Sequence, residues 1–222
     1  MKKSFVIFIV FIVLTGKLSA TDHHFLVLES EKTAKLFSFG PGIGIGFFYP
    51  KDLNTYIQDY FNDKYSKTVN IDIYEYFLIN ATASFLFSPY TELQVETEYA
   101  VAPKVVLGGD ISYAYHRFSP AIKFNGLIPL GKRISYFIGG GISYNLLSFK
   151  ALDQDFTYKG QTPGFSLQTG VRLHFGKISL EPAINFNFIK ADVEDSPTGS
   201  STITPVKELS YTGGQLGCKI FF

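Results

Sequence analysis

Residues 36–48 read LFSFGPGIGIGFF. Apolar residues occupy every odd position from Phe37 to Phe47, and serine or glycine occupies every even position between them. Because strand side chains alternate between two faces, this stretch predicts a strand with one apolar face and one nearly bare face. Glycines at alternate positions weaken an ordinary strand. They suit a strand whose second face lies inside a narrow barrel, where other groups approach the backbone closely.

The same alternation returns in six further segments of the chain. Each has Phe, Ile, Leu, Val or Tyr on one face and small, polar or charged residues on the other. These segments are 77–87, 92–101, 135–145, 165–175, 178–188 and 215–222. The repeated period of two predicts an all-β chain.

An eighth segment, residues 110–128, is less regular. Tyr113 and Tyr115 fall on odd positions, whereas Phe118 and Phe124 fall on even ones, which predicts a β-bulge near residues 116–117. A turn at that point would instead split the segment and raise the strand count to nine or ten. We favour eight strands, with ten as the alternative, because an even count returns both ends of a barrel to one side of a membrane.

The connections between these segments alternate in length. Short links occur at 88–91, 130–133 and 176–177, and longer ones occur at 49–72, 150–161 and 190–208. Short turns on one rim and long loops on the other are typical of outer-membrane β-barrels. The pattern therefore predicts a closed antiparallel transmembrane β-barrel. A soluble lipocalin-type barrel would also alternate, but it would line its cavity with the apolar face and expose the glycine face to water.

If the polar face is enclosed, its charged groups need partners, because an unpaired buried charge is costly. We expect a lumen charge network formed by Glu92, Glu96, Glu98, Lys123, Arg172, Glu181 and Lys219. A tight turn at 176–177 would place Arg172 opposite Glu181 and His174 opposite Ser179.

The N-terminus predicts export. Lys2 and Lys3 precede an apolar run at 5–14, and small residues follow at 19–20, which is the pattern of a cleaved signal peptide. As a helix the run would span about 15 Å, roughly half of a hydrocarbon core. A buried N-terminal helix is the alternative. We expect a signal peptide at 1–20, an N-terminal segment at 21–35 and a barrel domain at 36–222.

Composition excludes several classes of function. The 222 residues carry a formal net charge of +1, which lacks the basic excess that nucleic-acid binding requires. The single cysteine, Cys218, excludes an intrachain disulfide and a cysteine-based zinc site. The 23 Phe and 14 Tyr require either a large aromatic core or a lipid-facing surface. We expect no cofactor.

The last segment carries a family resemblance. Leu216, Cys218, Ile220 and Phe222 alternate and finish on an aromatic residue, which resembles the C-terminal assembly signal of bacterial outer-membrane barrels. With the stretches GIGIGFFYP (42–50), PLGK (129–132) and YFIGGG (136–141), the chain resembles the small outer-membrane β-barrel proteins of the OmpA/OmpX/OmpW-like group. The resemblance implies a Gram-negative cell outer membrane, contact with its lipid and recognition by the barrel assembly machinery. It implies no substrate.

Two loops and the histidines are the remaining candidates for a site. Residues 52–64 show helical spacing, which predicts a short lid helix in the first long loop, either a structural cap or a partner-facing element. Its apolar residues are Leu53, Tyr56, Ile57, Tyr60 and Phe61. The acidic loop 190–208 lacks the spacing of a calcium loop, and His23 with His24 is a weak metal pair, so no metal site is assigned.

The leading hypothesis for function is a non-enzymatic outer-membrane barrel with a structural or surface-interaction role. The first alternative is a narrow channel or conduit for small or apolar solutes, although side chains can fill the interior of eight strands. The second is a lipid-modifying enzyme, which needs a nucleophile and a base within reach. Only His23, His24, His116 and His174 are available as a base. His174, beside Ser179, is expected near the periplasmic rim, which is the wrong place for outer-leaflet chemistry. His116, in the irregular segment with Arg117 and Ser119, is the only outer-side histidine in a strand, and no catalytic residue is assigned.

Overall fold

The computed structural model describes residues 36–48, 55, 75–107, 111–151, 157–192 and 208–222. The expected signal peptide, N-terminal segment, lid helix (apart from Thr55), the His23 and His24 pair and most of the acidic loop lie outside these residues. No helix in the described part of the chain is long and apolar enough to cross a membrane.

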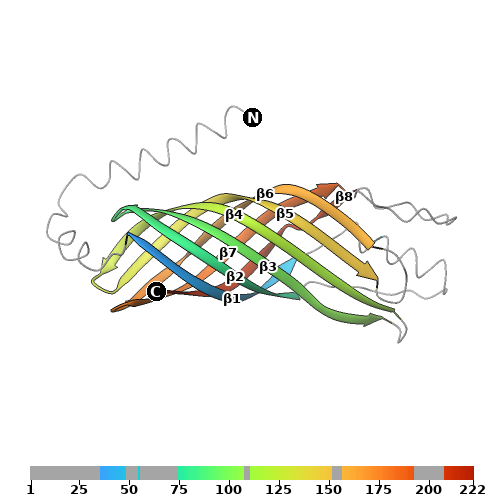
Figure 1. Cartoon of the computed structure of the whole chain (residues 1–222), viewed down its shortest axis with the longest axis horizontal. Helices are drawn as coiled ribbons and strands as arrows, with labels where there is room; N and C mark the ends of the chain where they lie inside the picture. Colours follow the sequence, from blue (N-terminus) through green and yellow to red (C-terminus); the bar gives the residue numbers. More distant parts are fainter. Residues whose placement is uncertain (1–35, 49–54, 56–74, 108–110, 152–156, 193–207) are drawn as a thin grey trace, which may run out of the picture.

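The described residues form a closed antiparallel β-barrel (Figure 1). Its strands are β1 Phe37–Phe48, β2 Glu75–Ser88, β3 Thr91–Leu107, β4 Ile111–Gly131, β5 Ile134–Ala151, β6 Thr157–Phe175, β7 Ile178–Asp192, β8 Glu208–Ser210 and β9 Gly213–Phe221. Consecutive strands pair from β1 to β7, β7 pairs with β9, and β9 pairs with β1 to close the barrel.

The short strand β8 and the strand β9 make up one wall strand. Lys190 lies opposite Ser210, and Asn187 lies opposite Gly213, so both pieces pair with β7 in the same register. The barrel therefore has eight strands around its wall, and the eight-stranded fold predicted from the sequence is confirmed. Figure 1 shows the short turns and the C-terminus at the left-hand end, which we call the short-turn rim, and the long connections at the opposite end.

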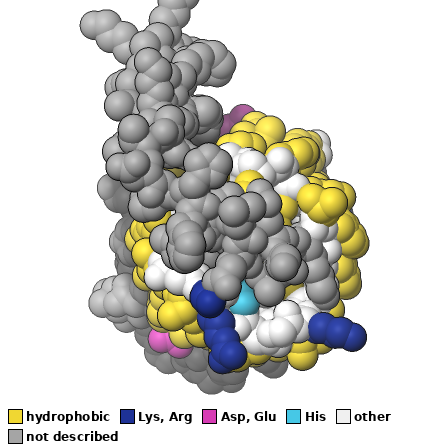
Figure 2. Space-filling view, turned by 90° about the vertical axis from the view of Figure 1, so that its left-hand side faces the viewer, with side chains coloured by type: hydrophobic (Ala, Val, Ile, Leu, Met, Phe, Trp, Pro, Cys, Tyr) yellow, Lys and Arg dark blue, Asp and Glu magenta, His cyan; other side chains and the backbone are white. Residues whose placement is uncertain are grey.

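The apolar face of the wall points outward. Phe87 is 67% exposed and Ile142 is 66% exposed, whereas the inward Gly40 and Thr82 are buried. Figure 2, which looks onto the left-hand end of the barrel in Figure 1, shows yellow hydrophobic side chains at its periphery. The orientation is the reverse of that in a soluble lipocalin-type barrel, so the transmembrane alternative is the one that the structure adopts.

The height of the apolar band fits a membrane. On β7 the outward apolar residues run from Ile178 to Phe188, and Lys190 and Asp192 follow them. At about 3.3 Å per residue and a tilt of about 45°, that length of strand projects to about 23 Å along the barrel axis. Transmembrane β-barrels have an apolar band of about 25 Å.

The bulge predicted near residues 116–117 is wrong. Strand β4 alternates without a break, so Tyr115 and Arg117 are both buried inside the barrel and Phe118 is exposed outside. The register shift lies instead in the partner strand β3, between Ala102 and Val105. Pro103 stands in that interval and has no N–H to donate to a ladder, which accounts for the irregularity there.

A methyl group at Gly40 is expected to destabilise the barrel by about 1–3 kcal/mol, because it would overpack the seam between β1 and β9. A Cβ atom there would overlap the backbone carbonyl of Ile220, which is not free to move aside. The matched control is Gly126→Ala, since the nearest atom to a Cβ at Gly126 lies 3.7 Å away. Urea unfolding in lipid vesicles, followed by heat-modifiability gels, would measure both. Equal stability of the two variants would contradict the prediction.

Candidate functional site: a charged lumen

The seven charged residues expected inside the barrel all lie there. They come from five strands: Glu92, Glu96 and Glu98 from β3, Lys123 from β4, Arg172 from β6, Glu181 from β7 and Lys219 from β9. None of them is more than 6% exposed. Each stands at an inward position because the period of two carries it to the face opposite the apolar band.

Arg172 joins two carboxylates near the short-turn rim. Its Nη2 lies 2.7 Å from Glu92 Oε1, and its Nε donates to Glu181 Oε2 at 2.8 Å. The tight turn between β6 and β7 sets the register that brings Arg172 to Glu181. The same register pairs His174 with Ser179, whose Oγ lies 3.0 Å from His174 Nδ1.

Glu96 forms the middle of the network. Lys123 Nζ donates to its Oε1 at 2.9 Å, and Lys219 Nζ lies 2.5 Å from its Oε2. Gln94 connects this group to the previous one, since its Oε1 accepts from Lys219 Nζ at 3.0 Å and its Nε2 donates to Glu181 Oε1 at 3.1 Å. One connected set across the lumen is thus formed by Arg172, Glu92, Glu181, Gln94, Lys219, Glu96 and Lys123.

One member of the network, Arg117, was not among the residues predicted to line the lumen. Its guanidinium is paired with Glu98 and lies over the ring of Tyr76, 5.2 Å from the ring centre. The bulge expected near residues 116–117 interrupted the alternation of the strand, so no face was assigned to Arg117. Continuing the alternation of β4 from Lys123 would have placed Arg117 inside.

With Arg117 included, the charges balance. Four carboxylates (Glu92, Glu96, Glu98, Glu181) meet four cations (Arg117, Lys123, Arg172, Lys219), and each carboxylate is ion-paired with at least one cation. Buried ion pairs offset the cost of desolvation only when every charge has a partner. Among the described charges of this network, each one has a partner.

Aromatic side chains fill the lumen beyond the network, towards the long connections. Phe48 packs against Tyr76, Tyr115 and Tyr211, with ring centres 5.5, 5.0 and 5.1 Å apart, and Tyr115 stacks on Tyr211 at 5.3 Å. We call Phe48, Tyr76, Tyr115 and Tyr211 the aromatic plug. Near the short-turn rim Leu127, Phe137 and Ala183 form a buried apolar cluster. The lumen is therefore occupied at both ends as well as in the middle.

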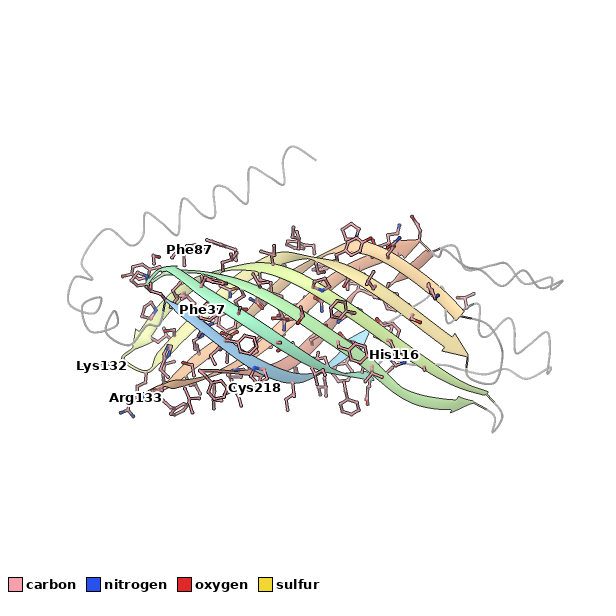
Figure 3. All side chains as sticks on the ribbon, in the orientation of Figure 1. Phe37, Phe87, His116, Lys132, Arg133 and Cys218 are labelled. Atoms are coloured by element: carbon pink, nitrogen blue, oxygen red, sulfur yellow. The ribbon has the colours of Figure 1, made fainter. Side chains whose placement is uncertain are left out.

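The groups considered for catalysis do not come together. His116 points outward, with its Nδ1 2.6 Å from Tyr99 Oη, whereas Ser119 points inward and donates to Asn145 Oδ1 at 2.6 Å. Figure 3 shows His116 on the wall of the barrel. The described residues hold no group of three or more His, Cys, Asp or Glu side chains that could bind a metal ion.

The residues of the expected assembly signal lie on the outer face of the last strand and just after it. Leu216, Ile220 and Phe222 are exposed, and Cys218 is a half-buried free thiol. Gly217 pairs with Gly44, and Lys219 pairs with Gly42, in the seam that closes the barrel.

No protein-family model and no curated protein sequence matches the chain. Among solved structures, Neisserial surface protein A has a TM-score of 0.54 at 10% identity, with 84% of this chain and 96% of that chain covered. Ail, the attachment invasion locus protein of Yersinia pestis, has a TM-score of 0.46 at 10% identity, with 85% and 100% covered. At this identity a likeness concerns the fold alone. The chain has the fold of the small outer-membrane β-barrel proteins, a closed barrel of eight antiparallel strands.

Proposed function

We propose that the chain is an integral outer-membrane barrel with a closed lumen, which acts through its wall and its loops in a structural or surface-interaction role. The observation that carries this proposal is the charge-balanced, side-chain-filled interior. Ions crossing a lumen of this kind would have to separate paired charges that are buried together. Loops held by a rigid scaffold are the usual place for recognition.

A conduit for small or apolar solutes would need the inward glycines to leave open space. Neighbouring side chains already occupy that space. A Cβ at Gly42 would lie 2.9 Å from Lys219 Cγ, one at Gly141 would lie 2.8 Å from Lys123 Cγ, and one at Gly170 would lie 2.8 Å from Phe137 Cε1. The glycines therefore make room for long side chains of the lumen, which favours a closed barrel over a conduit.

Planar bilayer recording tests the closed lumen. We expect the purified barrel to give no sustained unitary conductance, because a crossing ion would have to displace the packed side chains of the lumen and separate its paired charges. The double variant Glu98→Ala with Arg117→Ala removes one ion pair and leaves the net charge unchanged. It should conduct more than the parent chain.

Sustained unitary conductance of the parent chain, equal to that of the double variant, would favour the conduit instead. Mass analysis of lipid A from cells with and without the protein tests the enzymatic alternative. If the mass of lipid A differs by one acyl chain between cells with and without the protein, a lipid-modifying role is favoured over a structural one.

A further inference from the structure

Three exposed cations stand together at the short-turn rim. Lys132 and Arg133 lie in the turn between β4 and β5, and Lys177 lies in the turn between β6 and β7. The two turns are neighbours, because Ile134 pairs with Leu173 and the backbone N–H of His174 donates to the carbonyl of Arg133 at 2.8 Å. We call Lys132, Arg133 and Lys177 the basic arc. Figure 3 labels Lys132 and Arg133 at this end, and Figure 2 shows dark blue side chains there.

The basic arc borders the apolar band directly. Leu130 and Ile134 flank its first turn, and Phe175 and Ile178 flank its second, all of them exposed and outward. A cation that follows the last lipid-facing residue lies at the depth of the lipid headgroups, where long basic side chains reach phosphate. A lipid beside these two turns can therefore contact the apolar side chains with its acyl chains and the basic arc with its phosphate.

A small cavity lies in the mouth of the lumen at the short-turn rim, and both turns border it. Its volume is about 60 Å³, and its polar lining includes Lys132, Lys177, Arg172, His174, Ser135 and Ser179. Phe222 also lines it, and none of the described residues that line it is Asp or Glu. A water needs about 10–15 Å³ of such volume, so the cavity has room for a few waters beside the two lysines. Lysine, arginine and hydroxyl groups are the usual donors to phosphate oxygens.

The other described parts of the two rims do not show this excess of positive charge. The β2–β3 turn of the same rim, residues 88–91, carries no charged side chain. Towards the opposite rim the described outward side chains carry charges of both signs. Glu75 and Asp192 are acidic, and Lys159 and Lys190 are basic. Positive charge is thus concentrated on one arc of one rim.

We propose that the basic arc binds the phosphate of anionic phospholipids in the leaflet that surrounds the short-turn rim. A phospholipid is favoured over a soluble anion because it alone offers both a phosphate and acyl chains for the adjoining apolar band. This proposal rests on the barrel spanning a membrane, which is part of the proposed function. It adds a lipid preference that neither the fold nor the closed lumen requires.

The test inserts the full barrel into bilayers of equal phosphatidylglycerol and phosphatidylcholine and identifies the lipids that stay bound after release into the mass spectrometer. We expect the parent chain to retain phosphatidylglycerol over phosphatidylcholine by roughly three- to fivefold, and the preference to fall in high salt. The variant Lys132→Gln, Arg133→Gln and Lys177→Gln should retain the two lipids equally. The matched control, Lys159→Gln with Lys190→Gln towards the opposite rim, should keep the preference of the parent chain.

Heat-modifiability gels confirm insertion of each variant before its lipids are counted. If the triple variant does not insert, the charge-retaining variant Lys132→Arg, Arg133→Lys and Lys177→Arg and the single substitutions decide the question. An inserted parent chain without preference, or a preference kept by the triple variant, would overturn the proposal. Displacement of the bound lipid by soluble glycerol phosphate at equal concentration would overturn the assignment to lipid. A parent chain that fails to insert at all would contradict the proposed function instead.

Discussion

Replacing Arg172 with methionine is expected to destabilise the barrel by about 3–5 kcal/mol, the cost typical of removing one partner from a buried ion pair. Methionine keeps an apolar chain as far as the position of Nε and removes the rest of the guanidinium with its charge. It leaves the carboxylates of Glu92 and Glu181, each fully buried, without the guanidinium that both of them contact. Lys219, 3.6 Å from Glu181, is already shared with Glu96, so it compensates only in part. Urea titration of the barrel in vesicles measures the loss.

Neutralising Glu92 as well should restore most of that stability. The double variant Arg172→Met with Glu92→Gln removes one cation and one carboxylate, so the remaining charges of the network balance and Glu181 keeps Lys219 at 3.6 Å. Replacing a complete buried ion pair is often nearly neutral. The exposed control Lys159→Ala should change the unfolding free energy by no more than about 0.5 kcal/mol. A loss below about 1 kcal/mol for Arg172→Met would show that the network contributes little to stability.

The sequence predicts which strand residues face outward better than it predicts the contacts among the inward side chains. Odd and even positions assign most strand residues to the correct face, because the apolar band makes any slip of one residue costly. The Arg172 and Glu181 contact is readable for the same reason, since a tight turn at Gly176 and Lys177 sets the hairpin register. Contacts across the lumen, such as Arg172 to Glu92, depend on the diameter and shear of the closed barrel. No local pattern encodes them.

Inward aromatic residues explain the one wrong prediction about the wall. Tyr115 was counted with the apolar residues of the outer face. Because it stands at an odd position and Phe118 at an even one, the alternation in β4 was predicted to shift between them. The structure places it in the aromatic plug with Phe48 and Tyr211, where it packs against rings from distant strands. Period-two patterns separate apolar from polar residues, and tyrosine belongs to both classes. Arg117, two residues away, was left out of the predicted network for the same reason.

Replacing Ile142 with arginine is expected to destabilise the barrel by about 2–4 kcal/mol in lipid vesicles, the cost of a basic side chain near the midplane of a bilayer. Ile142 is outward, 66% exposed and midway along β5, between Ile134 at the short-turn rim and the strand end at Ala151. The same substitution on the surface of a soluble barrel would place arginine in water at almost no cost. Urea unfolding in vesicles, with folded and unfolded forms separated by gel migration, measures the difference.

Leu130→Arg is the matched control, because Leu130 is 65% exposed but lies beside the turn at the short-turn rim. Arginine there reaches headgroups and water, so the loss should be about 0–1 kcal/mol. Ile142 and Leu130 are almost equally exposed, and both variants introduce the same arginine side chain. A larger loss of stability for Ile142→Arg can therefore only come from the greater depth of Ile142 in an apolar phase around the barrel. If the two variants were equally stable, the exposed phenylalanine and isoleucine side chains of this barrel would not face lipid.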